Sequence, residues 1–140
     1  MPPAAPHTIR LRGPWKLTPL KRPDAQPVAG RIDQPSDRFL GDYTGPVLYV
    51  RHFNRPTGIG PEERVELAIT ACVGTAHVSL NETPLANSTA QQAPFRIDIT
   101  DLLQLSNQLA IEIIPPALPS PAEITGEVQL EIHCGEDSAD

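Results

Sequence analysis

Aromatic side chains are scarce in this 140-residue chain: phenylalanine, tyrosine and tryptophan make up 4% of it. Several familiar motifs are missing as well. No G-x-S-x-G nucleophile elbow, G-x-G-x-x-G turn or Walker loop occurs anywhere in the sequence. The chain therefore offers little material for stacking on a ligand and no recognisable catalytic motif, and we expect no enzyme activity from it alone.

Clustered positive charge is also missing. The formal net charge is -6, and no basic run is longer than the pair Lys21-Arg22. Nucleic acids and anionic membranes require clustered Lys and Arg, so neither is expected as a partner. No apolar stretch is long enough to span a bilayer, and the first six residues have no positive or apolar region typical of a secretory signal. These features predict a cytoplasmic location.

Metal-ligand patterns are equally rare. The two cysteines, Cys72 and Cys134, are expected to be free thiols, with Cys72 on the more solvated face of a strand and Cys134 on the drier face. The four histidines, at positions 7, 52, 77 and 133, lack the spacing of a metal site. We therefore predict no metal and no cofactor.

What the sequence does contain is alternation of apolar and polar residues with a period of two. In 65–73, for example, Val65, Leu67 and Ile69 share one face while Glu66 lies on the other. Such runs predict about eight strands, at 7–12, 15–18, 47–53, 65–73, 76–80, 95–99, 109–114 and 128–133. Strands with one apolar face suit an all-β antiparallel jelly-roll β-sandwich.

The connections can be predicted too. Gly74-Thr75 suits a tight hairpin, 100–103 suits a helical turn capped by Thr100, and Ser106-Asn107 suits a turn. The segments 19–45 and 81–94 are expected to be loops. The 17 prolines are expected to lie between the strands, because proline cannot donate to a sheet ladder.

Two large side chains are candidates for the core. Trp15, the only tryptophan, is predicted to be a core anchor. Arg51 shares a strand face with Tyr49 and Phe53, so it is either a buried cation with a carboxylate partner or a residue at the solvated end of its strand. Both alternatives remain open from the sequence.

Several segments, in the right order, resemble the sugar-binding jelly-roll domain at the N-terminus of glycoside hydrolase family 2 enzymes, the β-galactosidases and β-glucuronidases. They are Leu11–Trp15 (L-x-G-x-W), Tyr49–Pro56 (Y-x-R-x-F-x-x-P), Val73–Asn81, Pro94–Leu103 (P-F-x-x-D-I-T-x-x-L), Asn107–Ile111 (N-x-L-x-V) and Ile124–Glu131. The resemblance spans most of the chain and implies a galactose-binding-domain-like fold. One departure is Asn81-Glu82, where the family has an N-G turn, and it predicts a hairpin tip of different backbone shape.

The resemblance also bears on function. The family's catalytic glutamates belong to a barrel domain with no counterpart here, which implies a non-catalytic, carbohydrate-binding-like module. The carboxyl groups in this chain, among them Glu62, Glu63, Asp98 and Asp101, are expected on solvated faces and turns. Retaining glycosidases instead hold two carboxyls about 5–5.5 Å apart.

In the resembled enzymes the counterpart of 33–45 lies near the substrate pocket. The candidate carbohydrate-binding residues are accordingly Asp33, Arg38, Asp42 and Tyr43, with Tyr43 and Phe39 as possible stacking platforms. The alternative is a structural or protein-interaction module that pairs with itself or with a separate hydrolase subunit and binds no sugar. By either interpretation, 7–134 forms the sandwich, residues 1–6 form a flexible tail and 135–140 form an acidic tail.

Overall fold

Two antiparallel sheets pack face to face in the computed structural model of the protein. The structure describes residues 7–22, 24, 26–32, 37–41, 43–89, 94–115 and 123–133. The expected all-β sandwich is confirmed, with ten strands in these described ranges where about eight were predicted. None of the helices in these described ranges has the length and apolar character that a bilayer span requires.

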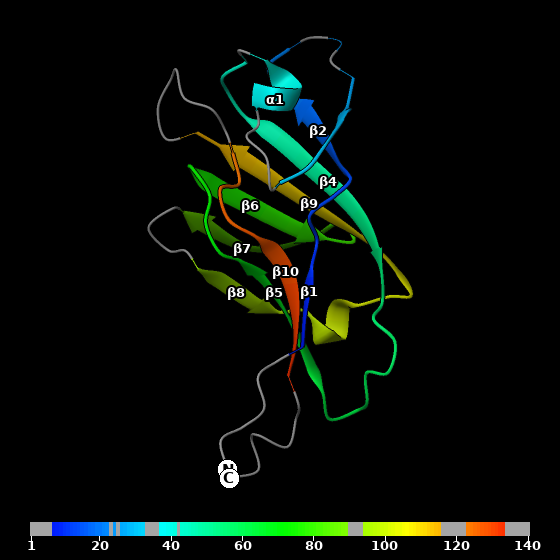
Figure 1. Ribbon diagram of the computed structural model, residues 1–140. Coiled ribbons are helices and arrows are strands. Elements are labelled where there is room, and N and C mark those ends of the chain that lie inside the picture. The colour runs from blue at the N-terminus through cyan, green and yellow to red at the C-terminus, as the bar shows by residue number, and fades with distance from the viewer. Residues whose placement is uncertain are drawn as a thin grey trace.

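The smaller sheet has the strand order β1-β10-β5-β8, and the larger has the order β3-β2-β4-β9-β6-β7 (Figure 1). The strand bounds are β1 His7–Arg10, β2 Trp15–Pro19, β3 Val28–Gly30, β4 Val47–Asn54, β5 Arg64–Ile69, β6 Thr75–Leu80, β7 Thr83–Thr89, β8 Phe95–Asp98, β9 Ser106–Ile114 and β10 Val128–His133. Two short helices, α1 (Asp37–Leu40) and the 3-10 turn η2 (Thr100–Leu102), complete the described elements.

The core lies between the sheets and follows the predicted alternation. In β9, Leu109, Ile111 and Ile113 are fully buried, and β6 contributes its own alternating set from the same sheet. Trp15 is confirmed as a core anchor: it is 0% exposed and its indole N–H donates to the Leu11 carbonyl at 2.6 Å. The ring meets Tyr49 edge to face, with centroids 6.3 Å apart, an arrangement that aromatic pairs favour.

The segment after β5 corrects three predictions. β5 ends at Ile69, and the residues at 70–74 cross from the smaller sheet to the larger one, so Gly74-Thr75 is not a hairpin turn. Because the alternation stops at Ile69, Cys72 faces the core rather than solvent and is 5% exposed. Burial raises the pKa of this thiol, which donates to the Gly74 carbonyl at 3.6 Å. Cys134 lies outside the described residues.

Gly74 makes the crossing possible. Its φ of 104° suits glycine, and a Cβ at this position would overlap the carbonyl oxygen of Ile114. The backbone of the crossing therefore lies directly against the end of β9. A local hairpin was the wrong prediction because a Gly-Thr pair says nothing about which sheet the next strand joins.

The predicted loops contain structure that the alternation did not reveal. Segment 19–45 contains β3 and α1, and segment 81–94 contains β7, which lies at the edge of the larger sheet. Two prolines lie inside strands: Pro19 is the last residue of β2 and Pro84 lies in β7. Both positions tolerate a residue that cannot donate to a ladder, since one is a strand end and the other an edge.

The tip of the β6–β7 hairpin has the backbone shape of a type I′ turn, although its second residue is Glu82 rather than glycine. Asn81 and Glu82 have φ values of 51° and 70°, and positive φ at both central residues is the requirement of a type I′ turn. The prediction of a different backbone shape was therefore wrong. Asn tolerates this region well, whereas Glu82 occupies it at a cost.

Asn81 is also tied to the start of β9 through Asn107, which is 1% exposed. The Asn107 side chain accepts from Asn81 Nδ2 at 3.0 Å and from the Gln104 amide at 2.8 Å. It donates to the carbonyls of Gln104 and Phe53, at 2.9 and 3.3 Å. Instead of forming a surface turn, as expected, Asn107 is a buried polar residue that joins the tip of the β6–β7 hairpin to β4 and to the connection before β9.

Two further local predictions are corrected. Thr100 is the first residue of η2 rather than its cap, and Asp98 Oδ1 accepts from both the Thr100 amide and its hydroxyl, at 2.9 and 2.6 Å. These hydrogen bonds lower the pKa of Asp98. Arg51 is half-buried and donates to the Pro14 carbonyl at 3.2 Å, so the alternative of a buried cation with a carboxylate partner is wrong: its partner is a carbonyl oxygen.

Candidate functional site

The structure describes two of the four predicted sugar-binding residues, Arg38 and Tyr43. Asp33 and Asp42 lie outside the described residues. Arg38 is exposed on α1. The Tyr43 hydroxyl donates to the Pro46 carbonyl at 2.7 Å and accepts from the Lys21 amide at 3.1 Å, so it holds its own loop together.

The two possible stacking platforms are both engaged. The Arg22 guanidinium lies 5.0 Å from the centroid of the Tyr43 ring, at cation–π distance. Phe39 packs against the core, and its ring lies so close to Gly30 that a Cβ there would be only 3.0 Å from it. A ligand would have to displace Arg22 to stack on that face of Tyr43.

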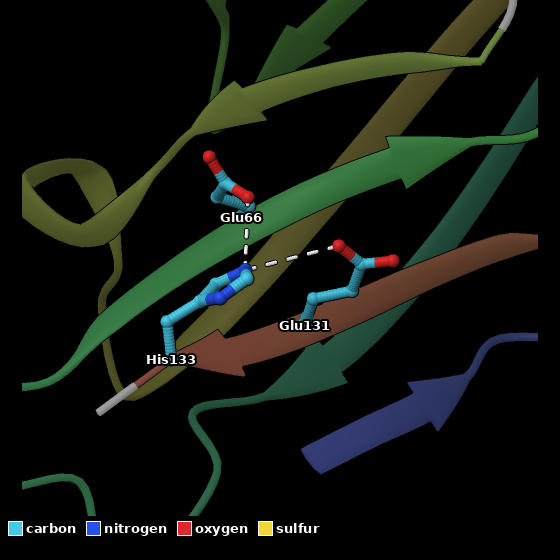
Figure 2. Close-up of side chains that lie close together, drawn as sticks. All are labelled: Glu66, Glu131 and His133. Atoms are coloured by element: carbon cyan, nitrogen blue, oxygen red, sulfur yellow. Dashed lines mark ion pairs between the residues drawn. The ribbon is translucent and has the colours of Figure 1, made fainter. Parts of the chain in front are cut away.

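A polar cluster that the sequence analysis missed lies on the outer face of the smaller sheet. It comprises Glu66 of β5 with Glu131 and His133 of β10 (Figure 2), and also Arg96 of β8. Glu66 and Glu131 are direct partners across the β5–β10 ladder. His133 Nε2 lies 2.9 Å from Glu66 Oε1 and 3.8 Å from Glu131 Oε1. Although Nε2 is buried, its geometry with Glu66 is that of an ion pair without a hydrogen bond.

Glu131 is the most constrained member of this cluster, with 6% of its side chain exposed. Arg96 donates to both of its oxygens, at 2.9 and 3.3 Å, and Gln129 donates to Oε2 at 2.8 Å. Hydrogen bonding from Arg96 lowers the pKa of Glu131 although burial acts in the opposite direction, and the same contact raises the pKa of Arg96. Glu131 is thus held ionised.

Two kinds of chemistry are relevant to this cluster: metal binding and acid catalysis by a pair of carboxyl groups. Glu66, Glu131 and His133 offer ligand atoms within 4.8 Å of one another, and these are the residues that could hold a metal ion. A cation would have to compete with Arg96 and Gln129 for Glu131. In an acid pair Glu131 would not suit the role of proton donor, because a general acid in glycoside hydrolysis needs a raised pKa and that of Glu131 is lowered. The arrangement fits a structural ion network better than either site.

A second feature is a hollow of about 190 Å³ on the outer face of the larger sheet. It lies over the central strands β4, β9 and β6 and reaches the edge strand β7. Its lining includes apolar Leu48, Leu85 and Ala110, and polar His77, Ser79 and Glu112. All six are half-buried, and those in β4, β6 and β9 alternate with core residues, so they form the outward face of the sheet.

The register explains how the hollow forms. Glu112 pairs with Leu48 of β4 on one side and with His77 of β6 on the other, while Ala110 pairs with Ser79. Small side chains at Ala110 and Ser79 leave space between larger neighbours. The β6–β7 ladder also slips here: two steps from His77 to Ser79 match three steps between their partners in β7. Such bulges redirect side chains and are frequent beside binding sites.

The polar groups of the hollow are uncommitted. Within the described ranges, the side chains of His77, Ser79 and Glu112 form no hydrogen bond or ion pair. A carboxylate, a hydroxyl and an imidazole thus lie beside an apolar floor, the combination typical of small-molecule sites. The alternation showed that these residues face outward, but it could not show that β6 and β9 pair and bring them together.

Comparisons with known proteins identify the fold. No protein-family model and no curated protein sequence matches the chain. Among solved structures, an FMN-binding β-glucuronidase from Faecalibacterium prausnitzii L2-6 is similar over 92% of this chain and 23% of its own, with a TM-score of 0.74 and 22% identity. A glycoside hydrolase family 2 β-galacturonidase from Eisenbergiella tayi, bound to galacturonate, matches over 94% and 25%, with a TM-score of 0.75 and 16% identity.

A β-glucuronidase from Bifidobacterium dentium is similar over 96% of this chain and 31% of its own, with a TM-score of 0.68 and 18% identity. The chain thus spans about a quarter to a third of the length of these enzymes. At this level of identity the likeness concerns the fold, and the galactose-binding-domain-like sandwich expected from the sequence motifs is confirmed. The chain has the fold of one β-sandwich module within glycoside hydrolases of family 2 and related glucuronidases.

Proposed function

We propose that this protein is a non-catalytic carbohydrate-binding module. The observation that carries the proposal is the similarity of over nine-tenths of the chain to a module occupying about a quarter to a third of enzymes that act on glycosides. The hollow on the larger sheet adds support, because it combines an apolar floor with three uncommitted polar groups. Arg38 and Tyr43 stay predictions for this role, and the Tyr43 hydroxyl already forms a hydrogen bond within its own loop.

Absence of catalysis is part of the same proposal. In the described residues, the close carboxylate pair Glu66 and Glu131 lies in an ion network rather than in a reaction site. The test is incubation with nitrophenyl glucuronides and galactosides at high protein concentration. We expect no release of nitrophenol above buffer. Release that survives repurification and is abolished in Glu131→Gln would contradict a non-catalytic role.

The affinity expected for one sugar ring is low. A ligand of about a dozen heavy atoms at about 0.3 kcal/mol per atom gains about 4 kcal/mol, which corresponds to a dissociation constant of about 1 mM. Titration of ¹⁵N-labelled protein with monosaccharides and disaccharides at millimolar levels, followed by NMR, detects binding in this range. Absence of any saturable shift with every saccharide tested would refute carbohydrate binding.

The second candidate is a protein-interaction module. It is favoured by the coverage of the structural matches, because in those longer chains this fold accompanies further polypeptide. Leu105, 84% exposed in the connection between η2 and β9, is a candidate contact for a hydrolase subunit or for a second copy. Light scattering after size-exclusion chromatography tests self-association, and a strict monomer at high concentration excludes that form of the proposal.

A further inference from the structure

We infer that the hollow on the outer face of the larger sheet is the carbohydrate site, and that the Glu112 carboxylate makes it selective for neutral sugars over uronic acids. The inference rests on the proposed function and specifies where the ligand binds and of which class it is. Its starting observation is one acidic and two further polar side chains around a shallow apolar floor, none of them with a hydrogen-bond or ion-pair partner among the described residues.

The size of the hollow limits the ligand. A volume of about 190 Å³ corresponds to about six water molecules, at about 30 Å³ each. Pockets for drug-sized ligands measure about 300–1,000 Å³. The hollow therefore suits one sugar ring, with the rest of a longer glycan extending into solvent.

The floor and rim suit the two faces of such a ring. Leu48, Leu85 and Ala110 present apolar surface to the C–H groups of a pyranose. The Glu112 carboxylate has two oxygens that accept hydrogen bonds, so it can bind two neighbouring hydroxyls of one ring. Ser79 and His77 lie on the adjacent strand and supply further donors or acceptors. Most of these groups project from central strands, so little ordering is needed on binding.

Charge then determines which sugars fit. Within the described part of the hollow, Glu112 is the one carboxylate of the lining. A uronic acid carries its own carboxylate, and two like charges about 4 Å apart repel by an amount that weakens binding about fivefold even in a fully aqueous environment. Neutral hexoses carry no carboxylate, so Glu112 does not repel them.

The experiment is an NMR titration of the full chain with galactose, glucose, galacturonate and glucuronate at low salt. We expect the largest shifts at the amides of His77, Ser79, Ala110 and Glu112, and an affinity for the neutral sugars at least about fivefold higher. In Glu112→Gln, which keeps the side-chain size and an acceptor, the neutral-to-uronate ratio should fall towards one. Glu62→Gln, at an exposed loop position, is the matched control and should leave the ratio unchanged.

A second variant tests the space itself. Ala110→Leu fills the hollow from an outward-facing position and should reduce binding of neutral sugars more than about tenfold while the far-ultraviolet circular dichroism stays unchanged. Saccharide-induced shifts confined to other regions, such as 37–43, would overturn the inference and leave the proposed function standing. Equal affinity for neutral and acidic sugars would overturn the assigned selectivity. No binding of any saccharide would refute both.

Discussion

Removal of the Asn107 side chain gives the sharpest test of how the tip of the β6–β7 hairpin is held against β4 and the start of β9. The amide makes four hydrogen bonds from a buried position: two to the backbone of Gln104, one to Asn81 and one to the Phe53 carbonyl. At about 1 kcal/mol for each bond, Asn107→Ala should lower the free energy of unfolding by about 4 kcal/mol. Domains are stable by only about 5–15 kcal/mol, so the loss is a large fraction of the total.

Urea unfolding followed by fluorescence of Trp15 measures this change. We expect a lower midpoint with an unchanged slope, because the surface exposed on unfolding stays the same. In a thermal scan, about 3–4 °C for each kcal/mol gives a fall of about 12–16 °C. Gln108→Ala, at the neighbouring exposed position, is the control and should change stability by less than about 0.5 kcal/mol.

A loss smaller than about 1 kcal/mol in Asn107→Ala would refute the reasoning. It would mean that water replaces the amide at little cost. The surroundings of Asn107 would then be more open to solvent than the structure indicates. Asn81→Ala removes three hydrogen bonds, to the Leu102 carbonyl, to Asn107 Oδ1 and from the Gln108 amide, and should lower the midpoint well below that of the control.

Three further predictions follow from the backbone and the ion network. Gly74→Ala should destabilise the fold by about 2–4 kcal/mol more than Gly58→Ala in urea unfolding. Both glycines have positive φ, but of the two only Gly58 has open space around it. Equal losses of stability would contradict the steric argument. Glu82→Gly should raise the melting temperature, since it relieves about 1 kcal/mol of left-handed backbone strain, and a fall would count against the type I′ turn. The pKa of Glu131 is lowered in the folded state, so its stabilisation is present above the ordinary value of 4.5 and is lost as the pH falls below it. Unfolding at about pH 6 and about pH 3 should therefore show a smaller acid-induced loss in Glu131→Gln than in the wild type, with Glu62→Gln behaving as the wild type.

Much of the fold could be predicted because alternation is a local property. The apolar faces of β4, β6 and β9 and the burial of Trp15 follow directly from the order of residues. The resemblance then supplied the sandwich that the strands build. What alternation could not supply is the pairing between distant segments, such as β5 with β10, which sets the environment of each outward side chain.

Ala68 and Glu131 illustrate the difference. Ala68 faces outward but is 0% exposed, because it pairs with Gln129 and Arg96, whose side chains are longer. Glu131 also faces outward and is buried by its partners on neighbouring strands. The hollow was missed for the same reason. Its residues come from four strands, and its depth depends on small side chains meeting across the ladder.

The pairing of β1 with β10 has a consequence for how this fold can be combined with others. His7 and Ile132 are partners in one antiparallel ladder, so the first and last described strands run side by side (Figure 1). Neighbouring strands lie about 4.8 Å apart, so the sandwich can be inserted into a surface loop of a host protein without stretching that loop. The same closeness allows a circular permutant in which a short linker joins these two strands and new termini open at the exposed turn around Gly58. Such a rearranged chain should retain both sheets, since every ladder of the sandwich would be preserved.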